Sequence, residues 1–303
     1  MKILEKTHID FMGTRKIWYS ISAAVIIIGI IGAFVRGVSF GIDFLGGTEL
    51  LVRFDNPPAI SEIRDAVQKA GFTSSEIKVF GSPNDILIRT AEQTKGTATL
   101  DAIRQQLTSQ FPNNPYTILK EDKIGPKIGA ELRTNAIYAI FSAMLIIMIY
   151  VGFRFQFIYG VAGVVALFHD VIATFGVIVL LNGLSPYLNL EIDQNIMAAF
   201  LTLVGFSIND TVVIFDRVRE NLKIHKAEDL STIINRSVNE TLSRSIITNG
   251  TVFMVLIVLV IFGGEVNRGF AFTFFIGTIL GTYSTIYVAS ALVLDFTKRQ
   301  AIK

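Results

Sequence analysis

Six long stretches of the chain are almost purely apolar, and polar residues gather between them. Each stretch has close to the roughly 20 residues that an α-helix needs to cross the hydrocarbon core of a bilayer. The pattern therefore predicts six membrane-spanning helices, with one long gap after the first. The expected spans are 17–35, 135–151, 157–181, 195–215, 245–262 and 270–294.

The gap at 37–132 has the pattern of a soluble domain. Short alternating apolar segments indicate strands, and two longer segments with apolar residues at helical spacing indicate amphipathic helices. The order predicts a βαββαβ, ferredoxin-like sandwich, a fold that hosts many functions. The segments, in order, are "TELLVRFD", "AISEIRDAVQKAGF", "EIKVF", "DILIRTA", "TLDAIRQQLTSQF" and "YTILKED".

Composition supports a membrane protein. Of the 303 residues, 51% are hydrophobic and 17% are charged, and the mean hydropathy is +0.54, which is too apolar for a soluble domain of this size. The net charge of +2 gives no support to nucleic-acid binding, and the chain has no cysteine. The first apolar run follows a basic segment, but no small-x-small cleavage site follows it, so we interpret it as an uncleaved anchor.

Lysine and arginine positions predict the orientation. Basic residues precede the first span, lie between the second and third and between the fourth and fifth, and close the chain, whereas the opposite short loops carry only Arg268. By the positive-inside rule, both termini face the cytoplasm and the gap is extracytoplasmic. The domains expected are 1–36 (cytoplasmic N-terminus and first helix), 37–132 (extracytoplasmic) and 133–303 (five further helices), the last with a cytoplasmic loop at 216–243.

That loop is charged at first and then apolar at helical spacing, through Leu230, Ile233, Ile234 and Val238. We expect it to hold an amphipathic helix that lies on the inner membrane surface.

Polar side chains interrupt the fourth span at Ser207, Asn209, Asp210 and Thr211. An ionised Asp inside a membrane helix costs roughly 2.5–3.5 kcal/mol on insertion scales. Asp210 either bonds to a neighbouring helix or to headgroups, or it belongs to an ion or proton path, as carboxylates in membrane segments usually do. Because six helices leave one flank open, we expect the face with Asp210, Gly205 and Ser207 to pack against a second bundle.

The start of the fifth span carries a predicted polar stripe of Thr241, Arg244, Thr248 and Thr251. Arg244 is either a basic anchor that reaches the cytoplasm or a partner for Asp210. Two antiparallel helices joined by a cytoplasmic loop place these two residues at similar depth. We therefore expect them to pair.

His169 and Asp170 lie about a dozen residues into the third span. An unperturbed His titrates near neutral pH, so the two residues either belong to a proton relay or bond to facing helices. Neither they nor the soluble segment form a His, Cys or Asp cluster typical of a metal enzyme. We expect no enzymatic activity, no metal and no cofactor.

Six longer motifs stand out along the chain: "GIDFLGGTE", "FRFQFIYG", "FHD", "GFSINDTVVIFDRVREN", "SVNETLSRSIITN" and "FFIGTILGTYSTIYVASAL". They resemble those of the SecD/SecF family of bacterial protein-export membrane proteins, and the resemblance covers nearly the whole chain. Ser284-Thr285 stands where the family pattern has two serines, which weakens any role for the second hydroxyl. Only one six-helix half is present, so we expect a separate subunit.

The resemblance implies a bundle like that of the resistance-nodulation-division transporters, in the bacterial inner membrane. It implies that Asp210 carries a proton and Arg244 is its basic partner, with protons as the coupling ion. Asn209, Thr248, His169 and Asp170 are further polar candidates. The "GIDFLGGTE" motif contributes Gly41, Asp43, Gly46 and Gly47 as a periplasmic-entry motif, although a tight turn explains its glycines equally well.

The same resemblance implies particular partners. They are SecD, the SecYEG channel, the accessory protein YajC, membrane lipid and unfolded preprotein at the external domain. Two other functions stay open: a proton-coupled exporter of small solutes built on a similar bundle, and a passive scaffold of the export channel. A solute exporter of this type is expected to carry much larger, duplicated external domains, and a scaffold is expected to tolerate replacement of Asp210.

Overall fold

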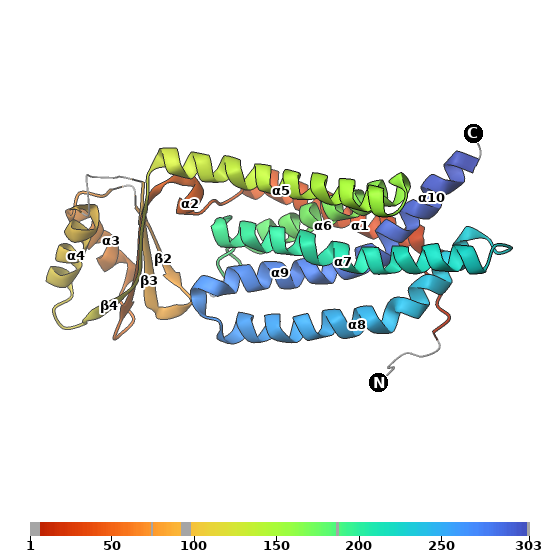
Figure 1. Ribbon diagram of the computed structural model, residues 1–303. Helices are drawn as coiled ribbons and strands as arrows, with labels where there is room; N and C mark the ends of the chain where they lie inside the picture. The colour runs from red at the N-terminus through yellow and green to blue at the C-terminus, as the bar shows by residue number, and fades with distance from the viewer. Residues whose placement is uncertain (1–6, 74, 92–97, 186–187, 302–303) are drawn as a thin grey trace. The chain divides into compact units, whose positions relative to one another are not determined.

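The computed structural model describes residues 7–73, 75–91, 98–185 and 188–301 (Figure 1). Two compact units make up the chain. The first, a helical bundle, comprises Met1–Val38, Tyr138–Leu180 and Asn195–Lys303. The second comprises Ser39–Ile137 and Leu181–Gln194, so the segment between the third and fourth long helices belongs to the unit that holds the soluble domain.

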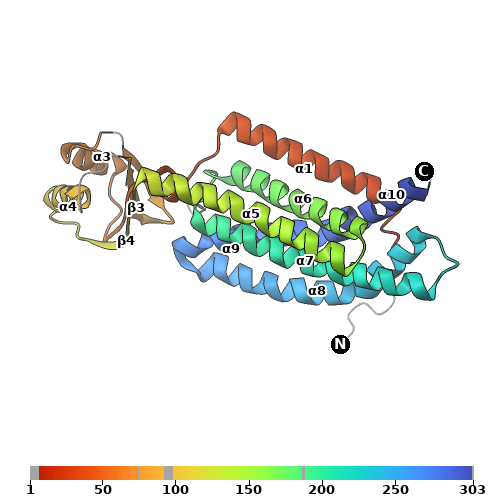
Figure 2. The ribbon, with the colours of Figure 1, turned by 45° about the horizontal axis from the view of Figure 1, so that its top comes forward.

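Within the described residues, six helical segments are long and apolar enough to cross a membrane, as the hydrophobic pattern predicts. They lie side by side in Figure 2. The last of them is built from two helices with one turn of π-helix between them. The bounds are α1 Arg15–Arg36, α5 Pro126–Arg154, α6 Phe157–Leu181, α7 Gln194–Ile224 and α8 Leu230–Phe262, followed by α9 Gly264–Ser284, η1 Thr285–Ala289 and α10 Ser290–Ala301.

Three of the six segments form the interior of the bundle. About half of the apolar window is buried in α6 (50%), in α7 (50%) and in the last segment (56%), against 17% in α1, 11% in α5 and 17% in α8. The outer helices expose long apolar side chains such as Phe34, Phe141 and Met254. An exposed apolar surface of this extent is typical of helices that face lipid or another protein in the membrane.

Glycines allow α1 and α6 to approach each other closely. A Cβ added at Gly29 would lie 2.6 Å from the Cα of Gly176, and a Cβ added at Gly176 would lie 2.7 Å from the Cα of Gly29. Small residues at a helix crossing bring the two backbones together, which is how membrane helices gain packing energy without a hydrophobic driving force.

The expectation of a separate surface helix in the loop 216–243 is wrong. Helix α7 continues to Ile224, and α8 begins at Leu230 and runs without interruption to Phe262. Asp229 caps α8, since its side chain accepts hydrogen bonds from the backbone N–H groups of Ser231 and Thr232. Ile233, Ile234 and Val238 are buried, and the last two belong to the core of the bundle. These side chains therefore pack inside the protein and do not face a membrane surface.

An N-terminal strap, residues 9–12, is fastened to the beginning of α8 by two asparagines. The amide of Asn239 both accepts from the N–H of Ile9, at 3.0 Å, and donates to its carbonyl, at 2.9 Å. Asn235 accepts from the N–H of Met12 at 2.9 Å. Phe11 and Met12 are buried in the same core as Ile234 and Val238. Both hydrogen bonds and apolar contacts therefore hold the strap to α8, although the two segments are far apart in sequence.

The soluble part of the second unit has the predicted βαββαβ order. Its four strands form a sheet in the order β2-β3-β1-β4, and each neighbouring pair is antiparallel. This is the strand order of a split-βαβ, ferredoxin-like sandwich. The bounds are β1 Gly47–Phe54, α3 Ile60–Lys69, β2 Ser75–Phe80, β3 Ser82–Thr90, α4 Ala98–Gln110 and β4 Tyr116–Ile124, with a short α2 at Ile42–Leu45 that the sequence pattern did not indicate.

The two faces of the sheet differ in what they bury. Leu50, Val52 and Phe54 alternate along β1 toward the core shared with α3 and α4. The intervening residues of β1 point to the opposite face, where Leu51 joins Phe80 and Leu87 in a smaller cluster. The opposite face also carries the charged side chains described below.

We expect Gly29→Ala to destabilise the bundle, because the added methyl would meet backbone atoms of Gly176 and not a movable side chain. Overpacking of this kind costs about 1–3 kcal/mol. The matched control is Gly205→Ala, where a Cβ has no neighbour within 4 Å and alanine is the better helix former. Heating detergent-purified protein before size-exclusion chromatography compares the variants; equal melting temperatures for both would contradict the α1–α6 contact.

Candidate functional site

Asp210 lies near the middle of α7 and is only 8% exposed. Its Oδ2 accepts a hydrogen bond of 2.7 Å from Nδ2 of Asn249 on α8, and the same nitrogen donates to Oγ1 of Thr282 on α9 at 2.9 Å. Within this chain Asp210 is therefore not open to the surface of the bundle, because Asn249 of α8 covers it. Gly205 is exposed, and Ser207 is buried against Asp170. That this face packs against a second bundle stays a prediction.

Arg244 is not within ion-pair distance of Asp210. Among the described residues, no ion pair of 4.0 Å or less joins them, although Arg244 lies near enough to interact electrostatically with the Asp210 carboxyl. The Arg244 side chain is exposed and lines a pocket of about 370 Å³ that also includes Arg154, Asp216 and Glu240. Arg244 thus belongs to a polar pocket, and the hydrogen bond to the buried carboxyl comes from Asn249 instead.

A second polar network surrounds Asp170, which is fully buried on α6. Asp170 bonds to Nδ1 of His169 at 2.9 Å and accepts a 2.6 Å hydrogen bond from Ser207 on α7. His169 Nε2 in turn contacts the hydroxyl of Tyr283 on α9 at 2.9 Å, and Tyr283 contacts Ser22 on α1 at 3.1 Å. One chain of side chains therefore crosses four helices.

Close backbone packing supports this second network. A Cβ added at Gly281 would lie 3.1 Å from Ser207 Oγ and 3.4 Å from Asp170 Oδ2, so any larger residue would press on these two side chains. One turn further along, Thr211 and Thr285 share a hydrogen bond of 3.1 Å. Thr285 opens the π-helix η1, and its carbonyl accepts from Ser290, five residues on. Single π-turns of this kind occur frequently at functional sites.

The buried polar stripe of α8 differs from the predicted one. Ser237, Thr241, Ser245 and Asn249 recur every four residues, and all are at most 6% exposed. Of the predicted stripe only Thr241 is buried; Arg244 and Thr251 are exposed and Thr248 is half-buried. Asn209, another candidate, is exposed on α7. Asn249 and Tyr283 were missed, and the four-residue spacing of small polar residues was the signal that could have found Asn249.

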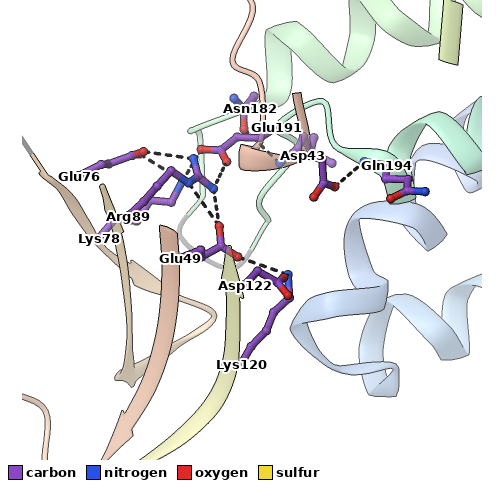
Figure 3. Close-up of polar contacts among 11 residues, drawn as sticks. Asp43, Glu49, Glu76, Lys78, Arg89, Lys120, Asp122, Asn182, Glu191 and Gln194 are labelled. Carbon is purple, nitrogen blue, oxygen red and sulfur yellow. Dashed lines mark hydrogen bonds and ion pairs between the residues drawn. The ribbon is translucent and has the colours of Figure 1, made fainter. Parts of the chain in front are cut away.

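The glycines of the "GIDFLGGTE" entry motif are explained by the backbone conformation and close packing of this segment. Gly46 and Gly47 have φ of 76° and 147°, values that residues with a Cβ rarely adopt. A Cβ at Gly41 would lie 2.9 Å from the Cβ of Asp193. Asp43 Oδ2 accepts the backbone N–H of Gln194, the first residue of α7, at 2.8 Å (Figure 3). The motif therefore holds the residues that begin α7.

A charged cluster, drawn in Figure 3, lies on one face of the sheet, and α3 and α4 pack on the other face. Arg89 of β3 pairs with Glu49 of β1 at 2.8 Å and with Glu191, which precedes α7, also at 2.8 Å. Lys78 bonds to Glu191 as well, and Lys120 lies 3.3 Å from Glu49. The cluster thereby fastens the segment before α7 to the sheet, together with a bridge between Phe40 and Ile192.

Burial and ion pairing shift the pKa values of the residues in this cluster in opposite directions. Burial acts to raise the pKa of Glu191, but the hydrogen bond and charge of Arg89, with Lys78, outweigh it and hold the pKa below its ordinary value. Burial acts to lower the pKa of Arg89, but Glu191 and Glu49 outweigh it and raise that pKa. Both groups are therefore ionised at neutral pH.

No group of three or more potential metal-binding side chains occurs among the residues that the structure describes. The donors near Asp210 and Asp170 are instead amides, hydroxyls and one imidazole. Such groups can donate and accept hydrogen bonds. The side chains of the site can therefore exchange hydrogen-bond partners inside the bundle.

These features define a class: a multi-pass membrane protein whose bundle contains buried carboxyls and whose second unit holds a small ferredoxin-like domain. Within that class, the chain belongs to the SecD/SecF family of protein-export membrane proteins. Residues 103–299 match the family model "Protein export membrane protein SecD/SecF, C-terminal". Residues 31–58 match the "SecD/SecF GG Motif" model.

Relatives along the full length support the assignment. The chain is 41% identical to the protein translocase subunit SecF of Rhodothermus marinus, over 100% of this chain and 98% of the relative. It is 38% identical to SecF of Escherichia coli O157:H7, over 94% and 87%. The crystal structure of SecDF from Thermus thermophilus, described as translocon-associated, aligns with a TM-score of 0.84 at 34% identity, covering 98% of this chain. The chain spans 40% of the length of that SecDF protein.

Stability at acidic pH tests the charged cluster. Because the folded-state pKa of Glu191 lies below its ordinary value of about 4.5, its contribution to stability is present above that pH and is lost as the pH falls through the folded-state pKa. We expect Glu191→Gln to lower the free energy of unfolding at pH 7 by about 1–3 kcal/mol. The difference from the wild type should shrink below pH 4.5.

Melting temperatures of the purified protein between pH 3 and pH 7 measure this. Glu62→Gln, at an exposed position of α3, is the control and should match the wild type throughout. A Glu191→Gln curve parallel to the wild-type curve over the whole range would show that the charge of Glu191 does not stabilise the unit.

Proposed function

We propose that this chain acts in bacterial protein export, as a membrane subunit that works with SecD and uses proton flux to promote the movement of preproteins through the SecYEG channel. The observation that carries the proposal is the carboxyl of Asp210, buried in mid-helix and hydrogen-bonded to a neutral amide. Carboxylates in such positions usually belong to ion or proton paths. Protons are the coupling ion, and no other cofactor is involved.

The surroundings of Asp210 suit a group that changes its protonation state. An ion pair at close range would hold the carboxyl ionised, whereas an amide can bond to either form because it offers both a donor and an acceptor. Arg244 acts on the carboxyl from the side of the polar pocket. We assign to the pocket the role of admitting water and protons, and to Arg244 the role of favouring proton release.

The chain of Asp170, His169 and Tyr283 has a different role in this proposal. It joins α6 to α7 and α9, so it holds fixed the helices against which α8 can move. Orientation follows the positive-inside rule, with both termini in the cytoplasm and the soluble domain outside the inner membrane. The exposed apolar faces of α1, α5 and α8 are left for lipid, SecD and YajC.

The soluble domain is the part that we expect to meet unfolded preprotein. In the described chain, β4 is an edge strand that pairs with β1 alone, and it exposes Ile118 by 39% and Leu119 by 44%. A free edge with apolar side chains can accept an extended peptide as an additional strand.

Replacing Asp210 tests the proton-carrying role. Asp210→Asn keeps the shape of the side chain but cannot bind and release a proton, so we expect export in membrane vesicles to fall to the level measured without a proton gradient. Arg244→Leu should lose part of the same stimulation. Asp101→Asn, at an exposed position of α4, serves as the control. Wild-type stimulation of export by Asp210→Asn would exclude the role and favour a passive scaffold.

Photo-crosslinking tests the preprotein contact. We expect a photoreactive amino acid at Leu119 to capture a preprotein arrested during export, because the side chain lies on the open edge of the sheet. The same probe at Glu62, exposed on α3, should capture far less. Equal capture at both positions, or none at Leu119, would remove β4 as the contact.

A further inference from the structure

Asn249 joins three helices at the buried carboxyl. It is 2% exposed, and its Nδ2 carries two hydrogens, one for Asp210 at 2.7 Å and one for Thr282 at 2.9 Å. The hydroxyl of Thr282 donates in turn to the carbonyl of Thr278 at 2.7 Å. A hydrogen-bonded path therefore runs from α7 through α8 to the backbone of α9.

The amide oxygen of Asn249 has no hydrogen-bond partner among the described residues, although it is buried. Most buried polar atoms in proteins are paired, and an unpaired one is unfavourable. The orphan therefore marks an acceptor that this state of the molecule does not use, on a side chain that already contacts the carboxyl of Asp210.

Rotation of the amide exchanges its donor and acceptor positions. The terminal torsion of Asn is broad and roughly two-fold, so half a turn places the oxygen where the nitrogen was. An ionised carboxylate only accepts hydrogen bonds, whereas a protonated carboxyl also donates one. In the observed orientation the amide suits ionised Asp210, and after rotation it suits protonated Asp210.

In the rotated state the bonds pass from the amide nitrogen to the amide oxygen. The oxygen, at the former nitrogen position, accepts from the protonated carboxyl, and the Thr282 hydroxyl turns from Thr278 to donate to the same oxygen. The orphan acceptor thereby gains partners. The carbonyl of Thr278 loses one, about two turns before α9 passes into η1. The two N–H donors give up Asp210 and Thr282, a cost that the new bonds of the protonated carboxyl must offset.

We propose that Asn249 is a positioning residue that responds to the protonation state of Asp210 by rotation of its amide and passes the change to α9 through Thr282. The proposal rests on the proton-carrying role of Asp210. Other titratable or charged groups around this site are Arg244 on α8, and His169 and Asp170 on α6, which reach α7 through Ser207. None of these contacts the amide of Asn249 in the described hydrogen bonds.

Infrared difference spectroscopy of the protein in lipid nanodiscs tests the proposal. The carbonyl band of protonated Asp210 is identified by its loss in Asp210→Asn. We expect Asn249→Ala to change the frequency of this band and to move its pH midpoint upward by about one to two pH units, because the ionised form loses a hydrogen bond to a charged group. Gradient-stimulated export should be lost as well.

Asn249→Ser provides the conservative comparison, since a hydroxyl can also either donate or accept. It should keep the midpoint closer to the wild type and retain part of the stimulation. Thr251→Val, at an exposed position of α8, is the control for helix stability and should leave the band unchanged. Asn249→Leu repeats the test with a side chain of similar size.

The possible results distinguish the positioning role of Asn249 from the proton-carrying role of Asp210. If Asp210→Asn abolishes stimulation but the Ala, Leu and Ser variants of Asn249 all keep the wild-type band and midpoint, the role of Asn249 is overturned and the proton-carrying role stands. Identical spectra for Asn249→Ala and Asn249→Ser would also overturn it, because donor and acceptor capacity would then not matter. Full stimulation in Asp210→Asn would instead remove the proposed function itself.

Discussion

A polar side chain inside this bundle must find its partner within the protein, because an apolar interior offers no water to satisfy it. Hydroxyl groups can use a carbonyl of their own helix, as Ser237 does with Ile233, but the carboxyls of Asp170 and Asp210 accept from donors on other helices. That constraint explains the arrangement of α6, α7, α8 and α9 better than hydrophobic burial does. Lipid chains are as apolar as the side chains themselves, so apolar contact alone gives little preference for one helix face. The hydrogen bonds of Asp170 with Ser207 and of Asn249 with Asp210 give that preference. Gly281 lets α9 lie close to the bond between Asp170 and Ser207.

The two buried carboxyls differ in their surroundings. Asp170 has no exposed surface and is enclosed by an imidazole and a hydroxyl. Asp210 keeps slight exposure, has an amide with a spare acceptor beside it, and interacts with an arginine at a polar pocket. These differences agree with the two roles that we propose, in which Asp170 holds the helices together and Asp210 changes its charge.

The sequence predicts the elements well but not which side chains meet. Membrane spans and the βαββαβ order depend on lengths and periods, which are local. The Asp210 partner depends on rotation about the helix axis: Arg244 lies at a suitable depth, but Asn249, five residues on, points about 140° away from it and faces α7. Similarly, the inclusion of 181–194 in the second unit rests on Glu191 meeting Arg89, a contact between segments distant in sequence.

The N-terminal strap has a consequence for the order of biosynthesis. Ile9 meets Asn239 across 230 residues, and at about 5–20 residues per second the ribosome needs roughly 10–50 s to make that stretch. During this interval the first helix already exists, while the binding surface for Phe11 and Met12 has not yet been synthesised. A segment made before the first helix is thus among the last to reach its native contacts, because the part of α8 that holds it is made about 230 residues later.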